Sequence, residues 1–600
     1  MVFHKRFVHY YFKYGLLLLL GIFALFVVDY GQLKVPELYK YVVNGMNDGV
    51  VEVNGVVRAF DMDFLLDVIC RPLIFVVIAV CGGRFLWRYC FFGAQVRMEA
   101  DIRKRMFDHC KDLSQQFYHL NKVGDLMSLF TNDVDTIQDS FGGGVLTFFD
   151  ALLLGSLAFI KMLRMNKTLT ALSMLPMIVL FLMALLVGYF MTKTWDKRQE
   201  AFSRLSDFAQ ESFSGIAVIK AFTKEVKELM AFRKLNKENE KINIKFTRIS
   251  VLMDILFILF VESVICVILG YGGYLVYNGT FKAGELVEFI SYFTTIIWPI
   301  EAISILIDMT ARAKASCKRI DTFLSADIDV HDKEGIDTRA RDIKGEIEFK
   351  NLDFTYPKSE LQVLQDVSFK INAGENVGLI GKTGAGKTTI VDLIARTYMI
   401  DDGKIFIDGE DVNNIPIKEL RKHIAYVPQD NFLFSDTIAS NIAFSKEDSS
   451  DKEAIKEAAV LSDVDSNIME FPNDYETILG ERGVTVSGGQ KQRISIARAL
   501  MKNAEILILD DSVSAVDTKT ERIILNNLAT TRKGKTTILI AHRISTIERM
   551  DKIIFIDDGK VLDVGTHKEL IERNAEYAEM VKSQMLEDEK TDAKEEEKDA

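Results

Sequence analysis

The sequence predicts two parts of different class: an all-α membrane domain with six spanning helices, then an α/β domain with short strands. In the first 325 residues, apolar stretches of roughly 20 residues recur, which is the length that a helix needs to cross a bilayer. After residue 325, short apolar strands alternate with helical stretches, a pattern typical of a parallel sheet. Of the 600 residues, 48% are hydrophobic and 26% charged, so the two kinds are segregated along the chain.

Composition excludes several classes. The length is too great for one soluble core, and the apolar content excludes an intrinsically disordered chain. A net charge of -12 argues against nucleic acid as a partner, because a phosphate-backbone binder needs a concentrated basic surface. The six cysteines lie in the first 320 residues without CxxC spacing, so neither a zinc site nor a disulfide scaffold is expected: Cys70, Cys81, Cys90, Cys110, Cys266 and Cys317.

The membrane half opens with the basic, aromatic segment HKRFVHYYFK. We interpret it as a membrane-surface helix that leads into a first span running from Gly15 toward Tyr41; the alternative, a cleavable signal peptide, lacks a small-residue cleavage site. The other five spans are expected near 64–92, 141–163, 168–191, 250–277 and 283–308.

Lysine and arginine placement orients these spans. Lys5, Arg6 and Lys13 precede the first span, and Arg97 to Arg105 follow the second, so both flanks should face the cytoplasm. The charged, helix-periodic segments 95–140 and 192–247 predict spanning helices that continue into the cytoplasm. An even number of spans returns the second half to the same side.

The second half predicts an ATPase-sized domain. Its expected strands are ENVGLI, KIFID, EILILD, TTILIA and KIIFID. We therefore divide the chain into a transmembrane domain at 1–325, an α/β domain at 326–585 and a charged tail without a fold of its own at 586–600.

The strand ENVGLI runs directly into a glycine-rich loop and then a helix that begins TTIVDLI, a strand–loop–helix context that predicts a phosphate-binding loop rather than an ordinary turn. Glycines let successive backbone N–H groups face phosphate oxygens, and the helix start adds positive potential. Lys387 should contact the β and γ phosphates and Thr388 should bind Mg²⁺, so ATP and Mg²⁺ are expected. The loop comprises Gly381, Lys382, Thr383, Gly384, Ala385, Gly386, Lys387, Thr388 and Thr389.

An apolar strand, Ile506 to Leu509, ends in Asp510, where a carboxylate would complete the Mg²⁺ site. Val486-Ser487-Gly488-Gly489-Gln490 resembles the signature of ATP-binding cassette (ABC) proteins, with Val486 in place of the usual Leu. The order of motifs also resembles theirs: Tyr356, the loop, Gln429, the signature, Asp510, Ser514 to Asp517 and His542.

The resemblance spans nearly the whole chain and is closest to ABC exporter half-transporters. It implies a membrane all-α six-helix exporter domain plus a cytoplasmic α/β P-loop ATPase domain, paired with a second half-transporter so that each ATP lies between one chain's loop and the other chain's signature. It further implies that Tyr356 stacks on adenine, Gln429 contacts Mg²⁺ and the attacking water, and His542 reaches the γ-phosphate. Without the shared order, each of these three would be read as an ordinary residue.

Three further segments resemble exporter features. Residues 114–137 and 212–225 resemble the two intracellular loops that rest on the ATPase domains, and Gly480-Glu481-Arg482-Gly483 resembles a segment that contacts the transmembrane domain. Their ordinary interpretations are amphipathic helices and a surface turn.

One position departs from the family pattern. Strongly hydrolysing exporters usually carry Glu directly after the Asp of the second motif, where this chain has Asp511. By resemblance, this change is typical of the weakly hydrolysing site in a heterodimeric exporter, so a heterodimer is favoured. The alternative is a homodimer whose backbone shifts to let Asp511 work slowly.

The transported molecule is less defined. Acidic residues in or near the spans predict either a cavity for cationic amphipathic compounds or pairing with Arg71, Arg84, Arg88 or the other subunit: Asp150, Asp254, Glu262, Glu301 and Asp308. Three hypotheses remain: an exporter of amphipathic, drug-like or lipid-like substrates in a bacterial inner membrane, a lipid or glycolipid translocase, or a regulatory ABC subunit with little turnover. An importer and a peptide-processing exporter are disfavoured.

Overall fold

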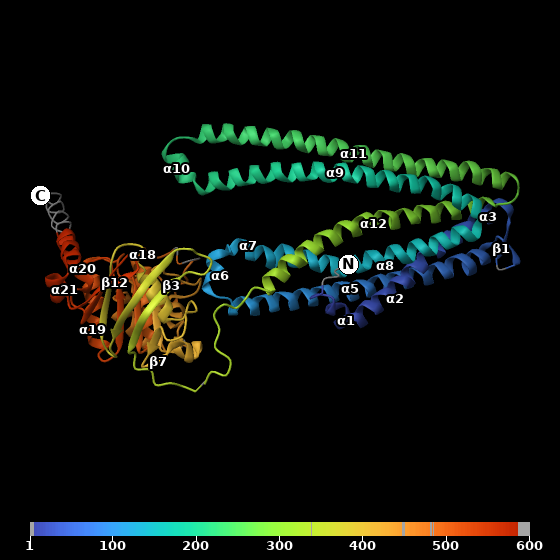
Figure 1. Ribbon diagram of the computed structural model, residues 1–600. Helices are drawn as coiled ribbons and strands as arrows, with labels where there is room; N and C mark the ends of the chain where they lie inside the picture. The colour runs from blue at the N-terminus through green and yellow to red at the C-terminus, as the bar shows by residue number, and fades with distance from the viewer. Residues whose placement is uncertain are drawn as a thin grey trace. The chain divides into compact units, whose positions relative to one another are not determined.

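The computed structural model describes residues 5–53, 55–337, 339–446, 451–480, 483 and 485–585, and at 177, 180–190 and 192 the backbone alone. The chain divides into two compact units (Figure 1). The membrane unit comprises Met1–His109 and Gly124–Ser325, and the ATPase unit comprises Cys110–Val123 and Ala326–Ala600. The segment 110–123 thus joins the second unit, although the sequence-based boundary assigns it to the first.

Long helices build the membrane unit, in the order α1 (His9–Lys13), α2 (Gly15–Gln32), α3 (Lys34–Asp48), α4 (Met62–Phe64), the π-helical η1 (Leu65–Cys70), α5 (Arg71–Asp112), α7 (Val123–Ser128), the π-helical η2 (Leu129–Asp133), α8 (Val134–Met165), α9 (Lys167–Ser214), α10 (Ile216–Ala221), α11 (Glu225–Tyr277) and α12 (Ala283–Leu324).

Among the described residues, five helical stretches are long and apolar enough to cross a membrane: Gly15–Asp48, Met62–Asp112, Val123–Met165, Glu225–Tyr277 and Ala283–Leu324. These contain five of the six predicted spans. The sixth predicted span, 168–191, lies in α9, and the side chains at 177 and 180–190 of this span are not among those that the structure describes. The predicted cytoplasmic extensions are also helical, since α5, α9 and α11 each exceed 40 residues.

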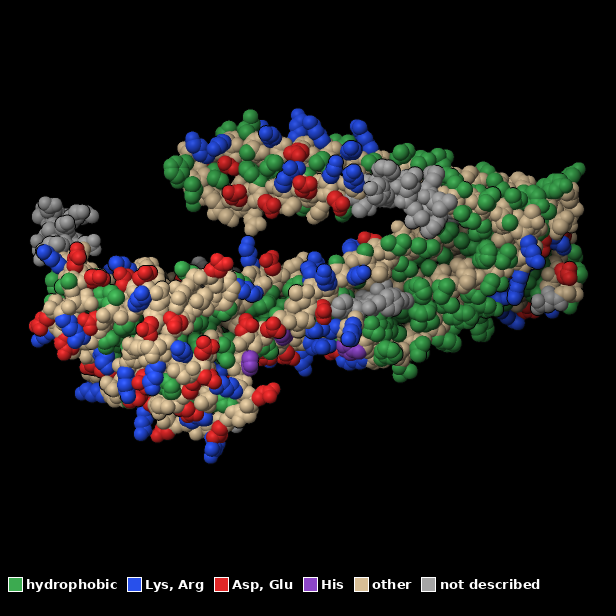
Figure 2. Space-filling view, in the orientation of Figure 1, with side chains coloured by type: hydrophobic (Ala, Val, Ile, Leu, Met, Phe, Trp, Pro, Cys, Tyr) green, Lys and Arg blue, Asp and Glu red, His purple; other side chains and the backbone are tan. Residues whose placement is uncertain are grey.

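Helix packing in this unit follows the apolar pattern. α9 and α11 run side by side, joined by α10, while α12 lies along α8 and α3 (Figure 1). The buried core includes Leu154, Val264, Phe289 and Phe293. Many apolar side chains instead face outward (Figure 2), for example Phe85 at 75% exposure. Such a surface fits lipid rather than water.

A short hairpin was not predicted. β1 (Val50–Val53) pairs antiparallel with β2 (Val56–Ala59) between α3 and α4. The sequence there predicts only a short connection between two spans, because four-residue strands give too little periodicity to recognise.

The ATPase unit holds two sheets. The larger has the order β12-β11-β5-β10-β9-β8, parallel except for β12, and the smaller is the antiparallel β4-β3-β6-β7. The strands are β3 (Ile347–Thr355), β4 (Gln362–Ile371), β5 (Asn376–Ile380), β6 (Ile405–Ile407), β7 (Glu410–Asp411), β8 (Ile424–Val427), β9 (Ile506–Asp510), β10 (Thr536–Ile540), β11 (Lys552–Asp557) and β12 (Lys560–Gly565). The five predicted strands are β5, β6, β9, β10 and β11.

Helices surround these sheets. They are α6 (Gln115–Leu120), α13 (Lys387–Ile394), the 3₁₀ turn η3 (Val412–Asn414), α14 (Ile417–Lys422), α15 (Ile438–Ala443), α16 (Lys452–Leu461), α17 (Asp465–Met469), the 3₁₀ turn η4 (Asp474–Glu476), α18 (Gly488–Lys502), α19 (Thr518–Thr531), α20 (Ile544–Ile547) and α21 (His567–Arg573). Apolar residues of α13 share one core with both sheets, which fixes α13 and the loop before it. A separate core joins α15 to α18. Residues 586–600, the predicted tail, lie outside the described part of the chain.

Segment 110–123 is held to the ATPase unit by α6. Gln116 donates a hydrogen bond from Nε2 to the carbonyl of Pro357 at 3.0 Å, and Ser114 donates to Asp329 at 3.3 Å. These contacts place the start of the predicted first intracellular segment next to Pro357, which follows Tyr356 just after the end of β3.

Candidate functional site

The phosphate-binding loop connects β5 to α13, as the sequence predicts. A Cβ on Gly381 would lie 1.8 Å from the carbonyl oxygen of Ile556, and Gly386 adopts a φ of +95° with Leu364 close by. Any larger residue would therefore clash or be strained at these two positions. The turn that they permit leads the chain straight into the N-terminus of α13.

Lys387, the first residue of α13, points back into the loop. Its side chain is 6% exposed, and Nζ donates hydrogen bonds of 2.9 Å to the carbonyls of Gly381 and Lys382. Burial lowers the pKa of Lys387, while the carboxylates of Asp510 and Asp511 act in the opposite direction. The ammonium group is thus held where a phosphate would replace loop carbonyls as its partner.

Asp510 ends the buried strand β9 and is 1% exposed. It accepts hydrogen bonds of 3.3 Å from the hydroxyls of Thr388 and Tyr426. Burial raises the pKa of Asp510, and these two hydrogen bonds oppose that effect. A hydroxyl and a carboxylate side by side are oxygen ligands of the kind that Mg²⁺ prefers.

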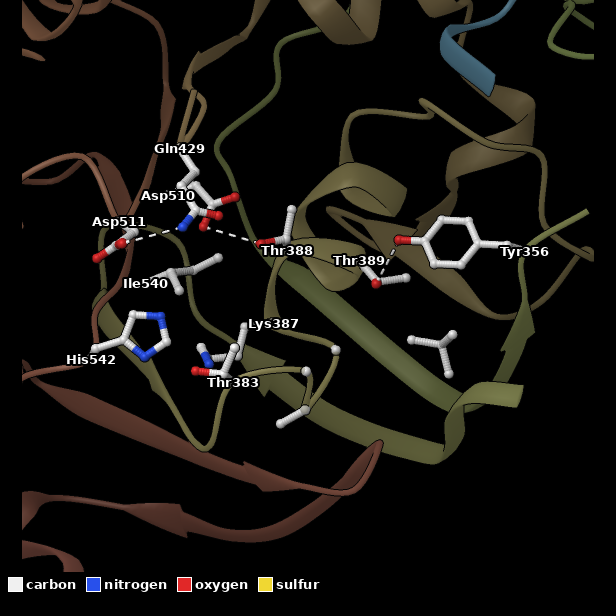
Figure 3. Close-up of a pocket in the computed structure, with 14 residues that line it drawn as sticks. Tyr356, Thr383, Lys387, Thr388, Thr389, Gln429, Asp510, Asp511, Ile540 and His542 are labelled. Carbon is white, nitrogen blue, oxygen red and sulfur yellow. Dashed lines mark hydrogen bonds between the residues drawn. The ribbon is translucent and has the colours of Figure 1, made fainter. Parts of the chain in front are cut away.

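Asp511, Gln429 and His542 lie on the same side of the site as Asp510, away from Tyr356 (Figure 3). Asp511 has a left-handed φ of +46° and its N–H donates to the carbonyl of Ile540. Gln429 Nε2 lies 3.5 Å from Asp511 Oδ2. His542 is anchored by Gln584, whose amide donates to the His542 carbonyl and accepts from the N–H of Ile544, both at 2.8 Å.

These side chains enclose one cavity of about 300 Å³ (Figure 3). Its walls are Tyr356, Val363, Thr383, Gly384, Ala385, Gly386, Lys387, Thr388, Thr389, Gln429, Asp510, Asp511, Ile540 and His542. A buried ammonium, a hydroxyl–carboxylate pair and the start of a helix fit the phosphates and Mg²⁺ of a nucleotide. When bound, ATP supplies the phosphoryl group that is transferred to water.

Two of the predicted residues form contacts with other side chains of the unit: Lys382, which lies outside the cavity, and Tyr356, which lines it. Lys382 Nζ pairs with Asp557 at 2.7 Å and is not part of the cavity wall. The hydroxyl of Tyr356 is 2.8 Å from Thr389 Oγ1, and the ring meets Tyr398 edge-on. Burial raises the pKa of Tyr356. The ring lines the cavity but is oriented by these neighbours.

The signature residues do not line this cavity. Ser487 is the N-cap of α18, and its hydroxyl accepts from Gln490 N–H at 3.2 Å while Gln490 Oε1 accepts from Ser487 N–H at 2.9 Å. Gly488 and Gly489 form the first turn of α18. Glu481 and Arg482 of the predicted contact segment lie outside the described residues.

Sequence reasoning missed three residues that shape the site: Tyr426, Gln492 and Gln584. Gln492 is 7% exposed, reaches the Asp511 carbonyl at 3.5 Å and accepts from Ala515 N–H at 3.1 Å. No motif marks these positions. Only Tyr426 could have been suspected from the sequence, because it lies three residues before Gln429, on the strand β8.

In the membrane unit, the acidic residues of the spans differ in their partners. Asp308 pairs with Arg312, and Arg71 pairs with Asp67. Asp150 Oδ2 accepts a hydrogen bond of 2.6 Å from Trp298. Asp254, Glu262 and Glu301 are exposed on their helices.

Comparison with known proteins agrees with both units. Residues 18–300 match the family model described as ABC transporter transmembrane region, and residues 364–514 match the one described as ABC transporter. The chain is 37% identical over 576 residues to the "Probable multidrug resistance ABC transporter ATP-binding/permease protein YheI" of Bacillus subtilis, covering 96% of each chain.

Two further proteins are similar over most of their length. The "Multidrug resistance-like ATP-binding protein MdlA" of Escherichia coli is 35% identical over 532 residues, which cover 88% of this chain and 89% of MdlA. A solved structure of a bacterial Atm1-family ABC exporter with ATP bound superposes with a TM-score of 0.76 at 25% identity, covering 96% of this chain and 98% of that one.

A transmembrane region and an ATPase are thus fused in one polypeptide, and the two relatives match 96% and 88% of it. The chain belongs to the ABC transporter family as an exporter half-transporter: a multi-pass bacterial inner-membrane protein whose cytoplasmic ATPase domain couples ATP hydrolysis to transport.

Proposed function

We propose that this chain is the subunit of a heterodimeric exporter that contributes a weakly hydrolysing ATP site, and that the pair exports amphipathic, drug-like or lipid-like molecules. The observation that carries the first part is Asp511 in the position next to Asp510. A carboxylate one methylene shorter than Glu is displaced by about 1 Å, and a misplacement on that scale can cost ~100-fold in rate. The multidrug names of the relatives support the substrate class.

The cavity residues receive proposed roles on the same basis. Lys387 and the loop N–H groups hold the phosphates, and Thr388, Gln429 and Asp510 hold Mg²⁺, partly through water. Asp511 and Gln429 orient the attacking water, while His542 donates to the charge that develops in transfer. Tyr356 offers its ring to adenine.

The signature supports pairing with a second half-transporter. Ser487 to Gln490 start a helix whose N-terminus favours an anion, yet they do not line the cavity of their own chain. We propose that they complete the ATP site of the partner chain, which carries Glu at the position of Asp511.

The proposal also keeps the domain limits expected from the sequence, which are 1–325 for the transmembrane domain, 326–585 for the ATPase domain and 586–600 for the tail.

The test measures phosphate release by this chain alone and by its complex with the half-transporter encoded next to it. We expect the complex to turn over about 100-fold faster than this chain alone. Asp511→Asn should change turnover of the complex only slightly, whereas replacing the partner's Glu by Gln should abolish it. The control is Asp401→Asn, an exposed aspartate of the same unit.

The opposite results separate the alternatives. Strong hydrolysis by this chain alone, lost in Asp511→Asn, would identify a homodimer and overturn the proposal. Stimulation of the complex by phospholipid but not by drug-like amphiphiles would favour a lipid translocase. If no substrate changes the ATP turnover of the complex, the chain is better described as a regulatory subunit.

A further inference from the structure

A second cavity, of about 490 Å³, lies inside the membrane unit, where α2, α5, α8 and α12 meet. It is lined by Leu25, Val28, Asp29, Gln32, Arg84, Trp87, Arg88, Asp150, Leu154, Thr294, Thr295 and Trp298. Each helix contributes residues at spacings of three or four: Arg84, Trp87 and Arg88 on α5, and Thr294, Thr295 and Trp298 on α12. Such residues share one face of a helix, so both helices turn a polar and aromatic face to the cavity.

The two carboxyl groups of this cavity are less accessible than its arginines. Asp29 is 1% exposed, and its Oδ2 has no hydrogen-bond partner in the part of the chain that the structure describes. Asp150 accepts a hydrogen bond of 2.6 Å from the indole of Trp298. The aspartates therefore sit behind or against other side chains, and Asp150 fixes the ring of Trp298 at the cavity wall.

The two arginines are placed differently. Arg84 and Arg88 are exposed and one turn apart on α5, and within the described part of the chain neither forms an ion pair. Asp150 attracts Arg84 electrostatically without reaching ion-pair distance. The guanidinium of Arg88 lies 5.3 Å from the ring centre of Trp87, an arrangement that holds it in place.

An arginine in a membrane-spanning helix is costly unless it faces a cavity or a counter-charge. Here two of them face the same cavity, each with five N–H donors suited to a planar or tetrahedral anion. Leu25, Val28 and Leu154 and the two tryptophans offer apolar surface beside them. The free donors are cationic, and the wall around them combines these apolar groups with polar side chains, which are Asp29, Gln32, Asp150, Thr294 and Thr295.

We propose that this cavity binds the anionic head group of an amphipathic ligand, with Arg84 and Arg88 as its ligands and Trp87 and Trp298 against its apolar part. The inference rests on the proposed export function and narrows the substrate class to amphiphiles with a phosphate, sulfonate or carboxylate group. It replaces the cationic-substrate hypothesis for this part of the membrane unit.

Tryptophan fluorescence of the full-length chain in the non-ionic detergent dodecyl maltoside can test it. The chain has three tryptophans, so Trp195→Phe leaves the two that line the cavity. The probes are dodecyl phosphate, dodecyltrimethylammonium and inorganic phosphate. We expect a saturable signal with dodecyl phosphate at least tenfold tighter than with either other probe.

The variant Arg84→Gln/Arg88→Gln should weaken dodecyl phosphate binding at least tenfold, because it removes the charge-assisted hydrogen bonds that would hold the anion. Arg71→Gln is the matched control: it removes a cation from the same helix, but Arg71 pairs with Asp67 and does not line the cavity. ATP binding by each variant reports whether it is folded.

Equal affinity for the cationic and anionic amphiphiles, tight binding of inorganic phosphate alone, or unchanged binding in the double variant would overturn the inference. Stimulation of ATP hydrolysis by each amphiphile separates the proposed anion site from the proposed export of amphipathic molecules. If the cationic amphiphile binds and stimulates turnover, export of amphiphiles stands and the anion site is wrong. If no amphiphile binds or stimulates, both proposals fail.

Discussion

The side-chain amide of Gln429 and the carboxylate of Asp511 meet at 3.5 Å at one end of the nucleotide cavity (Figure 3). Both side chains come from residues that directly follow or nearly follow strands of the same sheet, β8 and β9. The reach of the carboxylate is therefore set by its side-chain length, since the strand ends fix the backbone.

Asp511→Glu should accordingly raise ATP hydrolysis by this chain's own site, by about 10- to 100-fold, because one methylene moves the carboxylate by about 1 Å. The measurement is phosphate release at saturating Mg-ATP. Asp401→Glu adds the same methylene on an exposed surface and should have no effect. Equal rates for Asp511→Glu and the parent chain would show that carboxylate reach does not limit this site.

Gln584 should act as a positioning residue for His542. Its amide makes two hydrogen bonds to the backbone on either side of Arg543, and each neutral bond contributes about 1 kcal/mol. In the hydrolysing complex, we expect Gln584→Leu to lower kcat about three- to tenfold for any site that uses this His542, with KM for ATP nearly unchanged. Lys582→Met, an exposed change two residues away, is the control. A rise in KM alone would contradict a positioning role.

Asp392 should make the stability of the ATPase unit depend on pH. It is 7% exposed, and burial, reinforced by the nearby Asp510, raises its pKa from 3.8 to about 6. Because the folded-state pKa is the higher one, the neutral carboxyl is favoured on folding. Its contribution is present below about pH 4 and is lost as pH rises through about 6, amounting to about 3 kcal/mol at most.

Asp392→Asn removes this titration. Without nucleotide, the variant should lack the parent's loss of stability between about pH 4 and pH 6, so the difference between the two unfolding curves should grow with pH and level off above 6. Thermal unfolding at a series of pH values measures it. A difference that stays constant over that range would mean that Asp392 ionises in the folded state as it does in the unfolded chain.

Asp133 and Arg319 tie η2 to the cytoplasmic end of α12. The carboxylate is 3% exposed and accepts hydrogen bonds of 2.9 and 3.1 Å from Arg319 Nε, with a further contact from Nη2. Arg319→Met leaves a buried charge without its partner and should cost about 1–3 kcal/mol of stability, discounted because the arginine is 61% exposed.

The double variant Asp133→Asn/Arg319→Met should recover part of that loss, since it removes the orphaned charge as well. Arg312→Met breaks the exposed pair with Asp308 on the same helix and should have little effect. Thermal unfolding in detergent gives the comparison. If the loss of stability in the double variant equals the sum of the losses in Arg319→Met and in Asp133→Asn, the two residues do not interact.

Local patterns made much of this architecture predictable. The stretch from Asn376 to Thr389 carries a strand, a tight loop and a helix start in one run, so its form follows from neighbours in sequence. Asp510 could be placed near that loop from its position at the end of an apolar strand, and His542 only from the order of motifs shared with the ABC family. The structure gives the physical reason, because β5, β10 and β9 are neighbouring parallel strands that end at the same edge of the sheet. The long apolar runs identified the spans for a similar reason: bilayer thickness sets their length.

Contacts between distant residues could not be predicted in this way. Gln116 reaches Pro357 across 241 residues, and Gln584 reaches His542 from a segment without any motif. The same limit applies to the acidic residues of the spans, because the rotation of each helix decides whether Asp150 meets an arginine or Trp298. Side-chain partners of this kind depend on the packed fold and leave no periodic trace.

The capping box at Ser487 has a further consequence. The hydroxyl accepts a hydrogen bond from Gln490, and within the described residues its own proton is not donated to any group. The same oxygen can therefore hold the helix start and still offer a proton to an incoming phosphate. Since this turn is already ordered in the single chain, clamping around nucleotide requires no local refolding there, and little conformational entropy is lost at this end of the contact when two subunits close.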